Sequence, residues 1–268
     1  MKKSLFYQHA IDAAQQENTS IGEIFAKVKA MGFDGLECEY TLFSKDPKGF
    51  KAEIDKAGLE VSNIDYYVDF GHVIDEKALA VFLEDAVTVG AKKVLVIPGF
   101  IENEEDRDHD MAEIARGLNI FCDMAEEKGI QLTLEDYDLH ISPVSTIGGL
   151  KYFMDRVPKI GFTFDTGNFM VNGESELEAF DVLGDRLKHF HLKDRVTSPI
   201  HEGDEEYTAI DGNKYYPCPV GAGVVDTDEC IRRVKAEGYE DYVTVEHFGS
   251  THQMEFLTAD IKYLEAHI

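Results

Sequence analysis

Four short β-prone segments of the chain each end in a side chain that can bind a metal ion. These side chains are Glu135, Asp165, His191 and Glu246; in every segment the preceding residue is apolar and the one before it is polar. Because strand side chains alternate between two faces, the polar residue and the terminal group share one face. Three carboxylates that converge in a poorly solvated site repel one another, and a divalent cation offsets this repulsion. The pattern therefore predicts a metal site formed by these four residues.

The ligand types also indicate which ion the site would hold. Three carboxylates and one imidazole form a mostly hard ligand set. Such a set favours Mn²⁺, with Mg²⁺, Co²⁺ and Zn²⁺ as alternatives. We expect one divalent ion per chain. One layer below it, on the face that the ligands share, we expect four polar residues, Thr133, Thr163, His189 and Thr244.

A repeated junction indicates the elements that position these residues. Each junction consists of an amphipathic stretch, a glycine and a short β-prone run; the glycines are Gly32, Gly58, Gly90, Gly129, Gly184 and Gly238. Glycine can adopt the left-handed conformation that ends a helix. The stretch 21–31 has apolar residues at helical spacing, and Ser20 with Glu23 is typical of a capping box at its start. With further runs near 4–9 and 160–165, the chain has eight predicted strands that alternate with helices.

Alternating strands and helices favour a parallel sheet with crossover helices. The length of 268 residues fits a closed (β/α)8 TIM barrel, which usually needs about 250 residues. A doubly wound open sheet is the rival fold, but residues 8–12 contain no phosphate-binding glycine loop after the first strand. We therefore predict a single (β/α)8-barrel domain over residues 1–268, with the four ligands at the carboxyl ends of its last four strands.

Composition narrows the range of partners. The chain has 52 acidic and 26 basic residues and a net charge of −26, which repels a phosphate backbone, so we expect no nucleic-acid partner. No stretch approaches the roughly 18 apolar residues of a membrane span, and the apolar start breaks at Gln8 and His9, too early for a signal peptide. The 4 cysteines lack a CxxC spacing and are expected to be reduced thiols. We predict a cytoplasmic protein and leave homo-oligomer formation open.

Over nearly its whole length, the sequence resembles the xylose isomerase-like TIM-barrel superfamily of sugar phosphate isomerases and epimerases. The motifs that carry this resemblance are Leu134-Glu135, Phe164-Asp165-Thr166-Gly167-Asn168, His189-Phe190-His191-Leu192-Lys193-Asp194, Gly221-Ala222-Gly223-Val224-Val225-Asp226 and Val245-Glu246. Together they are specific for the superfamily and weak for any one member. In proteins of this type, the four strand-end positions bind Mn²⁺, Mg²⁺, Co²⁺ or Zn²⁺.

The resemblance implies a metal-dependent reaction on a small carbohydrate. In the epimerases of the superfamily, the two glutamates, here Glu135 and Glu246, also transfer protons. Proton abstraction beside a ketone leaves negative charge on oxygen, and a bound divalent cation stabilises that enediolate. One glutamate can remove a proton from one face of the carbon while the other reprotonates the opposite face. The expected function is isomerisation or epimerisation of a sugar or sugar phosphate.

Three alternatives remain open. A dehydratase of a keto-cyclitol or related keto-polyol, of the inosose or dehydroshikimate dehydratase type, would use the same enediolate and expel a β-hydroxyl. An endonuclease IV-like DNA repair enzyme shares the superfamily fold, but it would need extra histidine ligands and a basic surface. A non-catalytic sugar-binding barrel would more naturally have lost ligands, whereas all four are present here.

Three further residues are expected to contact substrate, namely Asn168, Lys193 and Arg195. Several members of the superfamily have histidine at the position of Asn168, and asparagine can hydrogen-bond a hydroxyl but cannot shuttle a proton. The insertion over 195–223 is either an exposed loop or a lid over the substrate. If it closes, Lys193, Arg195 or Lys214 could meet a phosphate or sugar hydroxyls.

Overall fold

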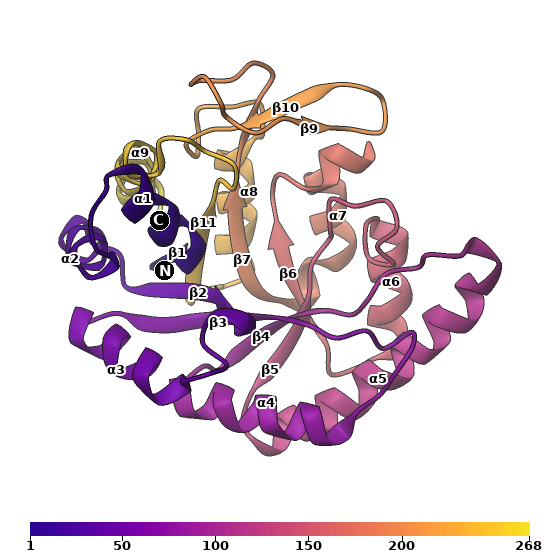
Figure 1. Ribbon diagram of the computed structural model, residues 1–268. Helices are drawn as coiled ribbons and strands as arrows, with labels where there is room; N and C mark the ends of the chain where they lie inside the picture. Colours follow the sequence, from indigo (N-terminus) through magenta and orange to yellow (C-terminus); the bar gives the residue numbers. More distant parts are fainter.

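The computed structural model describes residues 1–268, and eight parallel strands form a closed barrel at its centre (Figure 1). The barrel strands are β1 (Lys2–Phe6), β2 (Gly35–Glu39), β3 (Glu60–Tyr67), β4 (Lys93–Ile97), β5 (Gln131–Leu134), β6 (Gly161–Asp165), β7 (Leu187–Lys193) and β11 (Tyr242–Glu246). Their order around the barrel follows the chain, and β11 closes it against β1. The predicted (β/α)8 barrel is confirmed.

Helices surround the barrel and follow its strands. They are α1 (Tyr7–Gln16), α2 (Ile21–Met31), α3 (Pro47–Ala57), α4 (Glu76–Val89), α5 (Arg107–Glu127), α6 (Ile147–Arg156), α7 (Glu176–Leu183), α8 (Thr227–Ala236) and α9 (Gln253–His267). Short 3₁₀ turns lie between them: η1 (Tyr40–Leu42), η2 (Glu104–Asp106), η3 (Phe169–Asn172) and η4 (Gly184–Arg186). The helix α2 begins at the predicted capping box of Ser20 and Glu23. None of the helices combines the length and the apolar character that crossing a lipid bilayer requires.

Two local predictions are wrong. The first strand was expected near residues 4–9, but β1 ends at Phe6 and α1 begins at the next residue. The buried residues His9, Ala10 and Ala13 follow helical spacing, and this explains the boundary. Gly184 was expected to end a helix in the left-handed conformation, as Gly32 does with φ 108°. It instead has φ −60° and opens η4.

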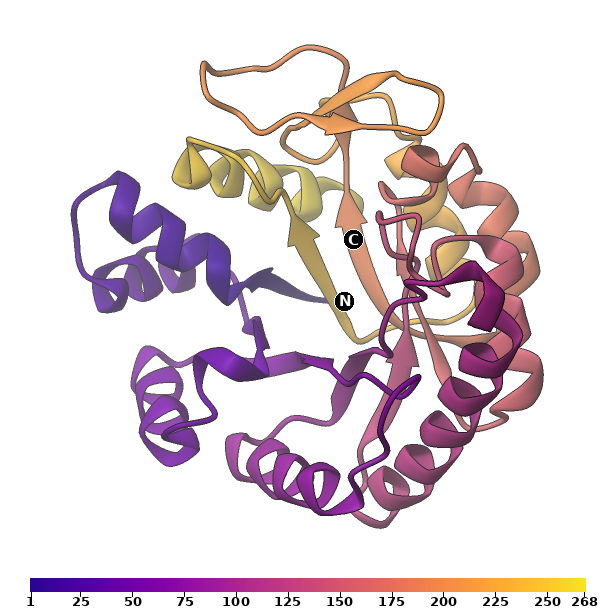
Figure 2. The ribbon, with the colours of Figure 1, turned by 45° about the vertical axis from the view of Figure 1, so that its right-hand side comes forward.

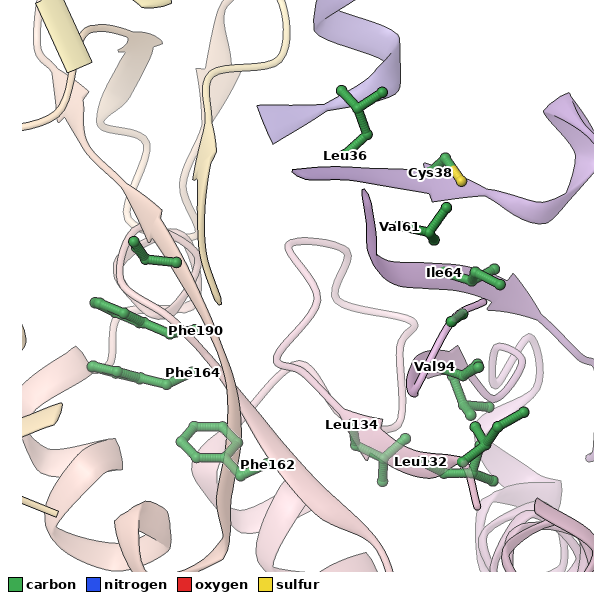
Figure 3. Close-up of a cluster of buried hydrophobic side chains, with 14 of the residues drawn as sticks. Leu36, Cys38, Val61, Ile64, Val94, Leu132, Leu134, Phe162, Phe164 and Phe190 are labelled. Carbon is green, nitrogen blue, oxygen red and sulfur yellow. The ribbon is translucent and has the colours of Figure 1, made fainter. Parts of the chain in front are cut away.

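Side chains alternate between the barrel interior and the layer under the helices, as predicted. Figure 3 shows apolar side chains of this outer layer, among them Leu134, Phe164 and Phe190, all fully buried. On the inner face, the Thr163 hydroxyl donates a hydrogen bond to the Thr133 hydroxyl at 2.7 Å. The polar residues of the ligand-bearing strands therefore line the interior below the strand ends.

The insertion at 195–223 forms a small three-stranded antiparallel sheet. Its strands are β8 (Arg195–Val196), β9 (Tyr207–Thr208) and β10 (Lys214–Pro217), in the order β8-β10-β9. In Figure 2 this sheet lies beyond the ends of β7 and β11, over the mouth of the barrel. The four cysteines are all buried and unpaired, as predicted.

Candidate metal centre

The four predicted ligands meet at one end of the barrel. Glu135 follows β5, Asp165 ends β6, His191 lies in β7 and Glu246 ends β11. One ligand atom from each residue lies within 4.8 Å of the others, and all four residues are buried. They meet because β5, β6, β7 and β11 are consecutive neighbours in the barrel. A repeated local pattern on adjacent strands thus becomes one cluster.

The hydrogen bonding of the Asp165 carboxylate indicates that this cluster fits a cation. Its Oδ1 accepts hydrogen bonds from the backbone N–H groups of Gly167 and Asn168, both at 2.7 Å. These bonds fix the carboxylate, while its buried Oδ2 has no hydrogen-bond partner in the protein. A buried carboxylate oxygen without a donor is costly, and a divalent ion bound by the four side chains would satisfy it.

His191 presents its two ring nitrogens to different carboxylates. Its Nδ1 lies 2.5 Å from Glu135 Oε1 and 3.6 Å from Glu246 Oε2, whereas its Nε2 lies 2.9 Å from Glu37 Oε1. Burial disfavours the charged ring, but the carboxylates of Glu135 and Glu37 outweigh it and hold the pKa of His191 well above its ordinary value. Without a metal, a proton on His191 offsets part of the negative charge that the ion would otherwise balance.

The two glutamates of the cluster differ in their affinity for protons. Burial, reinforced by the nearby charges of Asp165 and Glu246, raises the pKa of Glu135 to about 8. Burial also acts on Glu246, but Lys193 Nζ lies 2.5 Å from its Oε1 and holds its pKa below the ordinary value. Burial raises the pKa of Asp165 to about 6. In the metal-free cluster, Glu135 therefore binds a proton more readily than Glu246 does.

Lys193, Asn168 and Arg195 form a chain of contacts beside the cluster. Lys193 Nζ donates to Asn168 Oδ1 at 2.7 Å as well as to Glu246, and both Lys193 and Asn168 line the central cavity. Arg195 is not among the residues that line this cavity. Its Nε donates to the Gly167 carbonyl at 2.8 Å, and its guanidinium lies 4.3 Å from the centre of the Tyr207 ring. Substrate contact by these three residues stays a prediction.

The cavity at the barrel mouth has a volume of about 560 Å³. Aromatic rings form much of its wall, namely Phe6, Tyr67, Phe100, Tyr137, Tyr207 and Phe248. Its carboxylates, besides Glu135 and Glu246, are Glu37, Glu39, Asp65, Asp138 and Glu205. Lys193 is the one cationic side chain in the lining, and the insertion contributes only Glu205 and Tyr207. Lys214 is exposed and pairs with Glu206, outside the cavity.

Sequence analysis missed several carboxyl groups at or near this cavity. Glu37 in β2 is fully buried, and Asp65 in β3 lines the cavity with its buried Oδ1 unpartnered. Burial and the charge of Glu37 raise the pKa of Asp65 well above its ordinary value. Asp136, next to Glu135, has both carboxylate oxygens buried without partners. The segment Asn63-Ile64-Asp65 has the same polar-apolar-acid pattern as the ligand strands, so a search of every strand for that pattern would have found Asp65.

Comparisons with known proteins agree with this fold. Residues 25–267 match the family described as xylose isomerase-like TIM barrel. An inosose dehydratase from Lacticaseibacillus casei is 25% identical over 259 residues, which cover 88% of this chain and 85% of the relative. The probable 3-DHS dehydratase AsbF of Bacillus anthracis has a TM-score of 0.76 at 19% identity, over 99% of both chains. The IOLI protein, solved with a zinc atom, has a TM-score of 0.74 at 18% identity, over 99% of this chain and 97% of the other.

Proposed function

The chain belongs to the xylose isomerase-like TIM barrel family, and from this premise we propose that it is a divalent-metal-dependent dehydratase of an uncharged keto-polyol, such as a keto-cyclitol. We rank this reaction ahead of the isomerase or epimerase expected from the sequence. The ranking is supported by the similarity to an inosose dehydratase, which extends over 88% of the chain.

The charge of the cavity carries the assignment of the substrate class. Its lining holds several carboxylates and a single ammonium group, that of Lys193, which already contacts Glu246 and Asn168. Apart from the metal ion, which the ketone of the substrate would engage, a phosphate or carboxylate on the substrate would meet negative groups without a free cationic side chain, and such like-charge contacts cost affinity. Rings of carbon atoms that carry hydroxyls, in contrast, can stack on the aromatic wall and hydrogen-bond to the carboxylates. An uncharged polyol therefore fits this cavity better than a sugar phosphate or an acid of the dehydroshikimate type.

A metal ion would be held by Glu135, Asp165, His191 and Glu246, and we keep Mn²⁺ as the favoured ion. When bound, it supplies Lewis-acid stabilisation of negative charge on the ketone oxygen of the substrate.

The protein groups divide the proton transfers between them. Glu246, kept ionised by Lys193, accepts the proton from the carbon beside the ketone. Glu135, the carboxyl group of the pair with the higher affinity for protons, donates a proton to the hydroxyl that leaves the next carbon. The bond to that hydroxyl breaks as the carbon–carbon double bond forms, and one water is lost. In the barrel order these two residues flank Asp165 and His191, so they reach the substrate from opposite sides of the centre.

The same two glutamates support a second candidate, epimerisation or isomerisation of an uncharged ketose. Glu246 would again remove the proton, and Glu135 would return a proton to carbon instead of to a leaving hydroxyl. A nuclease is disfavoured, since the carboxylates of the cavity would repel a phosphodiester backbone.

Product analysis separates these reactions. The Mn²⁺-loaded protein is incubated in D₂O with an inosose, an uncharged ketose, a ketose phosphate and dehydroshikimate, and the products are analysed by mass spectrometry and NMR. We expect a product of the inosose that has lost one water. An epimer that carries deuterium and has lost no water would favour the second candidate. Turnover of the phosphorylated or carboxylated compounds alone would contradict the proposed substrate class. Asp165→Asn serves as the control that lacks a metal ligand.

A further inference from the structure

We propose that Glu37 is a positioning residue that fixes the tautomer and ring orientation of His191, as part of a hydrogen-bonded column along the barrel interior that starts at Lys93. The inference rests on the proposed metal centre but not on the reaction. It assigns a role to three buried polar residues, Glu37, His189 and Lys93, that the proposed mechanism does not use.

The column begins with Lys93 in β4, which is 5% exposed. Its Nζ lies 3.1 Å from His189 Nδ1 and 3.2 Å from the Lys188 carbonyl, and it pairs with Asp241 at 3.0 Å. An ammonium group has hydrogen-bond donors and no acceptor. His189 Nδ1 must therefore accept, and the neutral ring of His189 carries its proton on Nε2.

The next link is the carboxylate of Glu37. His189 Nε2 lies 2.8 Å from Glu37 Oε2, which also accepts a hydrogen bond from the Thr244 hydroxyl at 2.8 Å. Glu37 Oε1 accepts one from Asn63 Nδ2 at 2.6 Å. An ionised carboxylate can only accept, so each of its oxygens is bound by a donor that fixes its position. Because Glu37 is fully buried, its charge requires these partners.

The column ends at the metal centre. Glu37 Oε1 lies 2.9 Å from His191 Nε2, which must donate to it. A His191 ring with its proton on Nε2 leaves the lone pair of Nδ1 directed to the centre, where Nδ1 lies close to Glu135 and Glu246. A carboxylate that binds the second nitrogen of a metal-ligating histidine orients the ring and strengthens the ligand. Here the carboxylate is itself oriented by a histidine and a lysine from the opposite end of the barrel.

A second metal ion is the competing explanation, because Glu37, His189 and His191 also lie close enough together to hold one. Three contacts argue against it. Both Glu37 oxygens already accept hydrogen bonds from the two rings at 2.8 and 2.9 Å. The ammonium of Lys93 lies against the other nitrogen of His189, which places a positive charge beside the site. The two explanations differ in the number of ions bound.

The direct test is ¹⁵N NMR of histidine-labelled, Zn²⁺-loaded protein, combined with calorimetric metal titration. For the parent protein we expect one ion per chain, with His191 protonated at Nε2 and metal-bound at Nδ1, and His189 protonated at Nε2. Metal bound to Nε2 of His191, or two ions per chain, would overturn the inference. This measurement needs no variant, so it stands even where substitution of a buried charge prevents folding.

Variants then test the role of Glu37. Glu37→Gln should lower Zn²⁺ affinity by about 10–100-fold, the range typical of such outer partners, and should weaken the preference for a proton on His191 Nε2. The matched control is Asp260→Asn. Asp260 is also a fully buried carboxylate beside a histidine, His247, at 2.9 Å, but that histidine is not among the four ligands.

The Asp260→Asn control should retain the parental Zn²⁺ affinity and the parental ¹⁵N spectrum of His191. Equal losses in both variants would mean that Glu37 only supports the fold and would overturn the inference. Parental affinity with an unchanged His191 spectrum in Glu37→Gln would do the same. No substrate enters these measurements. A protein that shows the expected spectra but dehydrates nothing would therefore contradict the proposed function and leave this inference standing.

Discussion

The two halves of the barrel are built from the same βα unit but contribute differently to the cavity. The strands β5, β6, β7 and β11 carry all four residues of the candidate metal centre. The strands β1 to β4 carry none of them, yet they line the cavity through residues such as Phe6, Asp65 and Tyr67. In the comparison, one half carries the candidate ligands, and the other contributes only to the wall of the cavity.

The interior column joins these halves. Glu37 and Lys93 come from β2 and β4, and they act on His189 and His191 in β7 across the barrel. A closed barrel brings such side chains together although their strands are not neighbours in the sheet. The division between the halves therefore concerns the four candidate ligands, and side chains of the first half still contact His189 and His191 in the second.

The largest effect is expected for loss of a ligand in the metal-binding half. Asp165→Asn removes a charge whose Oδ2 is unpartnered and places an amide group in the cluster. Metal affinity should fall by more than the roughly 100-fold upper range for outer partners, and dehydration should fall to background. Metal content after dialysis, measured by mass spectrometry, checks this. The control variant Glu39→Gln, in the cavity lining of the other half, should keep its metal. If this variant also lost the metal, the comparison between the halves would be wrong.

The next effect concerns the two glutamates of the metal-binding half. At saturating Mn²⁺, Glu135→Gln and Glu246→Gln should each reduce kcat by about 10²–10⁴, as is typical of losing a general acid or base. The proposed roles predict different hydrogen exchange. Glu246→Gln should lose exchange of substrate hydrogen with D₂O, whereas Glu135→Gln should keep it without completing dehydration. Parental exchange rates in metal-saturated Glu246→Gln would show that this residue is not the base.

The sequence predicted the fold and the convergence of Glu135, Asp165, His191 and Glu246 because both depend on local patterns. Strand-end positions such as Asp165 and Glu246 follow from alternation along one strand, and neighbouring strands follow from chain order. The glycine junctions and the capping box at Ser20 are equally local, and they identified the helix ends; Gly184 also follows α7, but without the left-handed conformation.

The parts that the sequence did not predict depend on contacts across the barrel. The distance from Glu37 to His191 depends on how β2 and β7 face each other across the interior, which no pattern within either strand encodes. The partners of the positively charged side chains could not be predicted from the sequence for the same reason. Lys193 and Arg195 look alike as free positive charges in the sequence, but in the structure Glu246 holds the first and the Gly167 carbonyl binds the second. Asn168 accepts hydrogen bonds from both.

As the pH falls, the affinity for the metal ion should decrease before the contacts of strands β1 to β4 with the substrate are affected. Protons compete with the ion for the ligands, and burial raises the pKa of Glu135 to about 8 and that of Asp165 to about 6. In the metal-free protein, Glu135 therefore holds its proton near neutral pH, whereas Asp165 takes one up only near pH 6 and below. Because His191 also gives up a proton when the ion binds, affinity should fall by at least about tenfold per pH unit below pH 8, and more steeply below pH 6. Calorimetric Mn²⁺ titrations at pH 6, 7 and 8 measure this, and a flat profile would contradict the proton competition.

The smallest effect is expected in the substrate-facing half, at Asp65. Its Oδ1 is buried without a partner in the protein, and the residue lines the cavity, so we expect it to accept a hydrogen bond from a substrate hydroxyl. Asp65→Ala removes this oxygen together with the rest of the carboxyl group. A lost hydrogen bond of about 1.4 kcal/mol lowers kcat/KM by about tenfold. Steady-state kinetics and Mn²⁺ titration of the same preparation distinguish an effect on the substrate from an effect on metal binding. If metal affinity falls together with kcat/KM, Asp65 acts on the metal centre, as proposed for Glu37, and the expected contact with the substrate is wrong.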